Sequence, residues 1–237
     1  MSDAIEFNYP PVDMTFFRKD LRRHKIPAPL KHRIGIGASL LKDQIKRVEQ
    51  DTTIRYPPTI VRPCALFDID NRIVVDAHVT IGQKGTLIFL EVVFAAPTVA
   101  FADEKKLLGI VAHEFIHYVA HTISIYQRMK LKGNLEGASI GEVPLEVKTR
   151  DIKARDEYNT VPAKDWLTGR TLEAWEAIEQ ESFTVSKWAD LVMKEWINKG
   201  YPTEDFKRGS PTRPERPGRV VHESDIIDKA KKLNIIS

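Results

Sequence analysis

Three histidines and one glutamate share one short segment, AHEFIHYVAH, which spans residues 112 to 121. His113, His117 and His121 are each four residues apart, and Glu114 directly follows the first histidine. On a helical wheel these four side chains fall within an arc of about 100°. Two histidines one turn apart can both bind a tetrahedral zinc ion. A glutamate beside the first can take a proton from zinc-bound water, which is the mechanism behind the H-E-x-x-H pattern.

The residues around this stripe favour a helix that is buried nearly all round. Unpaired buried imidazoles and carboxylates cost several kcal/mol, so the stripe needs partners, and Zn²⁺ would be one. We therefore expect His113 and His117 to bind zinc and Glu114 to be the catalytic base. The alternative is a core helix whose histidines are satisfied by hydrogen bonds. The apolar positions of the helix are Leu107, Leu108, Ile110, Val111, Phe115, Ile116 and Val119.

His121 does not fit the same zinc ion on an unbroken helix. It lies about 12 Å of helix rise from His113. The metzincin pattern would place its third histidine at position 123, which is Ile123, and a glycine at position 120, which is Ala120. We expect His121 to pack beside the ligands or to orient them.

Strand-like runs precede the histidine helix. They are TIVRPCALF (59–67), RIVVDAHVTI (72–81), which alternates apolar and polar residues, and TLIFLEVVF (86–94). Their short connections predict an antiparallel β-meander.

Helices are expected on both sides of these runs. Asp103 is a plausible N-cap for the histidine helix. The segment 35–50 is expected to be a turn, at its glycines, followed by a helix, and the other segments expected to be helical are 104–126, 171–198 and 224–233.

The 237 residues fit one domain with extensions. We divide the chain into an N-terminal basic arm and helix (1–50), a catalytic domain (51–200) and an extended C-terminal tail (201–237). Cys64 is the only cysteine, so no internal disulfide or cysteine-rich zinc knuckle can form. No apolar run is long enough for a membrane span and no secretory signal is visible, so a cytoplasmic location is expected.

The net charge of +3 is unevenly spread. Basic residues cluster between Arg18 and Arg33 and again between Lys207 and Arg219. These patches could contact nucleic acid or hold neighbours in an assembly. The ordinary alternative is a solvated surface.

HEFIHYVAH resembles the zinc-binding helix of the ImmA/IrrE-type metallopeptidases, and more broadly that of the gluzincins. The order of elements, from meander to histidine helix to a later glutamate-bearing helix, is also similar over about residues 59 to 198. The resemblance implies a zincin-like α+β fold in which a glutamate of the later helix is the third zinc ligand.

Two glutamates compete for that third position. On a wheel of the helix 171–198, Glu181 lies inside the apolar arc and Glu179 lies on its border. A carboxylate inside a buried face needs a partner, which zinc would supply. We therefore choose Glu181, with Glu179 as the alternative.

Together these residues predict a zinc metallopeptidase that acts on a protein or peptide, with the substrate added as a strand to the edge strand 86–94. Tyr118, Tyr158 and His222 are candidates to stabilise the oxyanion. Two other classes stay open. One is a zincin-fold structural or binding protein, such as a phage component associated with the virion. The other is a DNA-associated protease guided by the basic patches.

Overall fold

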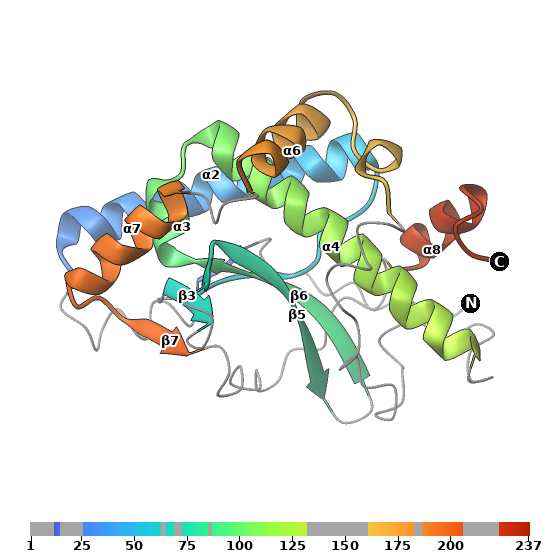
Figure 1. Cartoon of the computed structure of the whole chain (residues 1–237), viewed down its shortest axis with the longest axis horizontal. Helices are drawn as coiled ribbons and strands as arrows, with labels where there is room; N and C mark the ends of the chain where they lie inside the picture. The colour runs from blue at the N-terminus through green and yellow to red at the C-terminus, as the bar shows by residue number, and fades with distance from the viewer. Residues whose placement is uncertain are drawn as a thin grey trace.

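The computed structural model describes residues 12–14, 26–62, 65–68, 73–84, 87–131, 161–182, 187–205 and 223–237 (Figure 1). The helices are α2 (Ala28–Thr52), α3 (Ala96–Phe101), α4 (Glu104–Leu131), the 3-10 turn η3 (Ala163–Asp165), α6 (Gly169–Ser182), α7 (Lys187–Asn198) and α8 (Glu223–Lys232). The strands are β1 (Val12–Asp13), β2 (Thr59–Arg62), β3 (Ala65–Asp68), β4 (Ile73–Val75), β5 (Ala77–Lys84), β6 (Leu87–Ala95) and β7 (Thr203–Asp205). The mixed α+β class expected from the sequence is confirmed. None of the described helices is long and apolar enough to cross a membrane.

The strands form two small sheets instead of one antiparallel meander. In the larger sheet the order is β1-β2-β6-β5, and in the smaller it is β4-β3-β7. β2 runs parallel to β6, and among the strands that the structure describes only the β5–β6 and β3–β4 pairs are antiparallel. The meander prediction was therefore wrong. The run 59–67 supplies a strand to each sheet, and Pro63 in its middle has no N–H to donate to a continuous ladder.

The prediction of the edge strand is contradicted over part of its length. The segment 86–94 was expected to be an edge, but β6 pairs with β2 on one side and β5 on the other. Both rows of its backbone groups are thereby used from Val92 to Ala95, the part of β6 that pairs with β2, whereas the described pairs of Leu87–Glu91 are with β5 alone. Within the described part of the chain, β5 is the strand at this end of the larger sheet.

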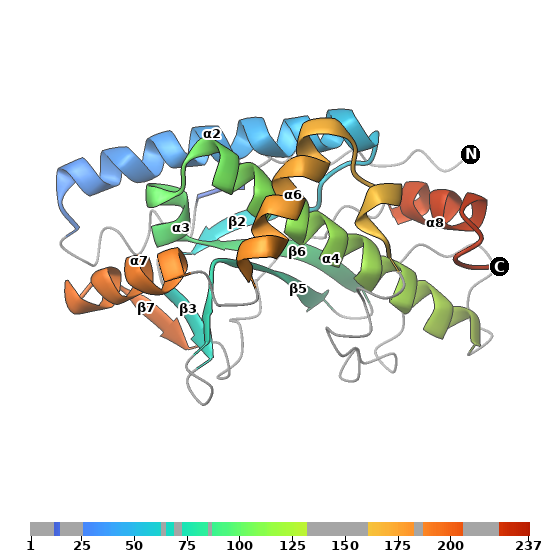
Figure 2. The same ribbon diagram turned by 45° about the horizontal axis from the view of Figure 1, so that its top comes forward.

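The helices cover the larger sheet, and α4 lies among them. α4 packs against α2, α6 and α8 and also contacts β5. Figure 2 shows α2 running along the top of the molecule, with α6 crossing α4 beneath it. One hydrophobic core draws on the N-terminal, central and C-terminal segments, from Val12 and Leu30 through Phe115 to Ile226.

The first long helix begins earlier than expected. α2 starts at Ala28, directly after Pro27, and a proline occupies its first turn, where a missing N–H costs nothing. Gly35 and Gly37 therefore lie inside the helix and do not form a turn before it. A Cβ at Gly37 would overlap the Val99 carbonyl oxygen at 1.7 Å. Glycine at position 37 thus allows α2 to lie directly against α3.

The segment 171–198 was expected to be one helix and forms two, α6 and α7, with residues 183–186 outside the described chain. The wheel used to choose Glu181 combined apolar residues from both helices, so its arc is not one continuous face. The short helix expected near the C-terminus is confirmed as α8. Its buried residues Ile226, Ile227 and Ala230 join the core, so this part of the tail is not extended.

A half-buried histidine on β5, His78, leads to a pH prediction. Burial of the ring, together with a smaller effect of the positive charge of Arg62, lowers the pKa of His78 from 6.5 to about 3. Because the folded-state pKa lies below the ordinary value, this group stabilises the fold fully above pH 6.5. That contribution is lost as the pH falls towards 3. Between pH 7 and pH 5 the loss from His78 alone is about 2 kcal/mol.

We therefore expect His78→Leu to flatten the dependence of unfolding free energy on pH over this interval. Denaturant unfolding at both pH values, in the presence of a chelator, measures the effect. His32→Leu is the matched control, because His32 is exposed on α2. Parallel pH profiles for wild type and His78→Leu would contradict the prediction.

Candidate functional site

The histidine motif lies in the middle of α4, as expected. The Asp103 carboxylate accepts a hydrogen bond from the Lys106 backbone N–H at 2.8 Å, which confirms it as the N-cap. The helix is buried nearly all round, with Leu107, Val111 and Phe115 among its fully buried residues. It therefore holds its polar stripe at a fixed position against the rest of the core.

His113 and His117 approach each other through their outer ring nitrogens. The two Nε2 atoms are 3.0 Å apart, and the rings meet edge-on with centroids 4.7 Å apart. A tetrahedral zinc ion with ordinary zinc–nitrogen bonds would separate two such nitrogens by about 3.3 Å. The pair therefore has nearly the spacing that one zinc ion requires.

Glu179 of α6 occupies the other side of His113. The Nδ1–H of His113 donates to Glu179 Oε1 at 2.6 Å, and both side chains are about three-quarters buried (22% and 26% exposed). In the neutral imidazole, a proton on Nδ1 for this hydrogen bond leaves a lone pair on Nε2. Carboxylates commonly orient metal-binding histidines in this way.

A glycine on α4 allows α6 to come this close. A Cβ at Gly109 would meet Ile178 Cγ1 at 2.2 Å and the Ala174 carbonyl oxygen at 2.6 Å. Gly109 lies one turn before His113, and Ile178 directly precedes Glu179. The close helix crossing therefore brings Glu179 to the motif.

Glu114 is buried, with 4% of its surface exposed. Its charge acts on Tyr56, whose pKa is raised well above 10, first by burial and then by Glu114. The Tyr56 hydroxyl donates to the Val111 carbonyl oxygen at 3.0 Å, and its ring stacks on Phe115. Tyr56 thus stays a neutral phenol beside the motif helix. Sequence reasoning missed this residue, which comes from the segment between α2 and β2.

Asp76 is a second residue that sequence reasoning did not select. It lies between β4 and β5, where burial raises its pKa from 3.8 to about 6. The charges of Lys106 and His113 and a hydrogen bond from Thr98 act in the opposite direction. Asp76 and His113 are therefore close enough to interact electrostatically. In the sequence Asp76 is one of the polar residues of the alternating run 72–81, and nothing else there marks it.

The structure describes some of the other site residues proposed from the sequence and leaves others undescribed. The His121 ring lies 6.5 Å from that of His117, between centroids, consistent with a packing neighbour. Tyr118 is buried, at 2% exposure. Tyr158 and His222 lie outside the described residues, as does the side chain of Glu181, so the choice of Glu181 stays a prediction.

Among the described residues, no three histidine, cysteine, aspartate or glutamate side chains converge as a ready metal-binding group. The histidine pair offers two nitrogens at suitable spacing, while Glu179 contacts the nitrogen that faces away from its partner. The site thus resembles a pair of ligands and an orienting carboxylate more than a complete set of three. Its groups are suited to proton transfer and to metal binding.

Comparisons with known proteins add nothing to this geometry. No family model matches the chain, and no curated protein or solved structure matches it.

Proposed function

We propose that the protein is a zinc-dependent metallopeptidase with a zincin-like catalytic core. The observation that carries the proposal is the approach of the His113 and His117 Nε2 atoms to 3.0 Å, with Glu114 next to His113 on the same buried helix. The residues fit zinc because two neutral imidazoles at this spacing are ordinary ligands for it. The resemblance to ImmA/IrrE-type metallopeptidases supports the same assignment.

The two histidines, Glu114 and strand β5 each have a distinct task in this proposal. His113 and His117 hold the metal, which when bound polarises the scissile carbonyl and lowers the pKa of water. Glu114 accepts a proton from water and later gives it to the leaving amine. The buried position of Glu114 restricts exchange of that proton with solvent. The substrate backbone pairs with β5, which is the edge strand in the described part of the sheet.

We assign Glu179, instead of Glu181, to the carboxylate role at this site. Positions 179 and 181 differ by about 200° around a helix, so both cannot face His113 at once. Glu179 makes the contact, and it does so through Nδ1 of His113. Its role is therefore to orient His113 and to keep Nε2 available for the metal.

Glu179→Gln should weaken zinc binding by about 10- to 100-fold, the usual effect of losing a carboxylate that orients a metal ligand. A competition titration with a zinc-binding dye measures the affinity. Glu181→Gln and Glu176→Gln should bind zinc like wild type, and Glu176 is exposed on the same helix. A large loss with Glu181→Gln and none with Glu179→Gln would restore Glu181 as the functional carboxylate.

Removal of the metal tests the function as a whole. Wild-type protein should cleave an unstructured protein such as casein, lose this activity on dialysis against a chelator, and regain it with about one equivalent of zinc. Product peptides are identified by mass spectrometry. Binding of one zinc per chain without cleavage of casein or a peptide library would favour a structural role. Failure to bind zinc would refute the proposal.

A further inference from the structure

A second site lies on the opposite side of α4 from the histidines. A pocket of about 310 Å³ is enclosed by α2 and by the first turns of α4 and α6. The residues of α4 that line it are centred about 150° around the helix from His113 and His117. The pocket is therefore separate from the proposed zinc site. Its polar lining residues are Gln44, Arg47, Glu104, Lys105, Arg170 and Glu173.

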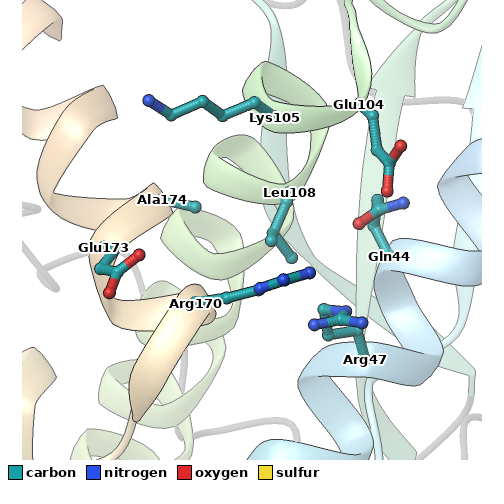
Figure 3. A pocket seen from close by; sticks show the side chains of 8 residues that line it. All are labelled: Gln44, Arg47, Glu104, Lys105, Leu108, Arg170, Glu173 and Ala174. Atoms are coloured by element: carbon teal, nitrogen blue, oxygen red, sulfur yellow. The ribbon is translucent and has the colours of Figure 1, made fainter.

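Two guanidinium groups border this pocket: the side chain of Arg170 is exposed and that of Arg47 is half-buried. Figure 3 shows the Arg170 side chain extending from α6 away from Glu173 and towards Arg47 of α2. Within the part of the chain that the structure describes, neither arginine forms an ion pair or a side-chain hydrogen bond. Like charges directed at one another repel, and an anion bound between them would offset that repulsion. Planar guanidinium groups bind carboxylate and phosphate oxygens in pairs.

Gln44 gives an independent indication of a ligand. Its side chain is 4% exposed and borders the pocket, yet it makes no hydrogen bond to any described residue. The Gln44 amide atoms are not among the fully buried polar atoms that lack a partner, so water in the pocket can reach them, and a bound oxyanion would replace that water. The amide N–H₂ can donate to an oxyanion held by the two arginines.

The remaining charges limit the kind of ligand. Three basic side chains face two carboxylates, so the lining has a net charge of +1, from Arg47, Lys105 and Arg170 against Glu104 and Glu173. The pocket also lies at the start of α6, the positive end of that helix. Glu104 lies beside Gln44 in Figure 3 and offers an acceptor for a hydroxyl or ammonium group of the same ligand.

We propose that this pocket binds the oxyanion, a phosphate or carboxylate group, of a small molecule. The bound group contacts Arg47, Arg170 and the Gln44 amide. It links α2 to the two helices that carry His113 and Glu179. The proposal does not depend on peptidase activity, because its test measures binding alone.

Calorimetric titration of the full chain with inorganic phosphate, and separately with succinate, tests the proposal at matched ionic strength. At least one of the two should bind saturably and raise the melting temperature. Arg47→Gln and Arg170→Gln should each weaken binding at least about tenfold, the effect of losing one charge-assisted contact. Lys46→Gln is the matched control, because Lys46 is exposed on α2 outside the pocket.

Gln44→Glu separates loss of binding from loss of folding. It changes the size of the side chain little, and it places a negative charge against the oxyanion. It should abolish binding while the circular dichroism spectrum stays that of wild type. Binding of phosphate alone or succinate alone identifies the group that the pocket accepts. Absence of saturable binding with both anions would refute the site. Equal affinity for wild type, Arg170→Gln and Gln44→Glu would refute it too.

Discussion

Glu114→Gln will retain zinc and lower the rate of peptide cleavage by about 10²- to 10⁴-fold, the range that general acid–base catalysis contributes. Glutamine keeps the size of the side chain but cannot accept a proton from water. Glu114 is buried beside the histidine pair, so bulk solvent cannot replace it as a base at close range. The kcat should carry most of the loss, since the proposed role is in proton transfer and not in substrate binding.

The measurement is kcat and KM on one identified cleavage site, together with zinc content by mass spectrometry. Glu176→Gln provides a matched control, since it makes the same chemical change at an exposed position. If Glu114→Gln cleaves as fast as wild type with zinc bound, another group is the base. If it loses zinc, Glu114 acts on the metal site itself.

The second large expected effect is the loss of zinc when either histidine of the pair is replaced. Wild-type protein purified without chelators should contain about one zinc per chain, and His113→Asn or His117→Asn should contain almost none. Removing either imidazole takes away one of two nitrogens that now lie 3.0 Å apart. The same variants should lose cleavage activity, because the metal and Glu114 act together.

His121→Asn is the appropriate comparison for these two variants. Its ring packs near His117 but lies a further turn along α4, so its zinc content should stay close to that of wild type. Complete loss of zinc in His121→Asn would make His121 a ligand. Unchanged zinc in His117→Asn would refute the histidine pair as the metal site.

The sequence alone was sufficient for the motif helix. Four-residue spacing, an apolar surround and the Asp103 cap are local properties, and each is visible without knowing what the helix contacts. The same holds for the α+β class and for α8. These features depend on helical periodicity and capping, which neighbouring residues determine.

Strand pairing depended on the tertiary structure. Alternation predicts that 59–67, 72–81 and 86–94 are extended, but it does not specify which strands pair or in which direction. The parallel pairing of β2 with β6, and the transfer of β3 to a second sheet, result from contacts between distant segments. The edge strand could not be identified until those pairs were known.

The tertiary structure also determined which carboxylates lie near the histidines. A wheel for 171–198 assumes one straight helix, and the division into α6 and α7 removes that assumption. Glu179 reaches His113 because Gly109 lets α4 and α6 approach closely, while Asp76 arrives from the β4–β5 connection. The spacing of residues along one helix determined the histidine pair. Only the packing of separate elements determined which acids lie beside it, because side-chain contacts across a core depend on the position of every backbone around them.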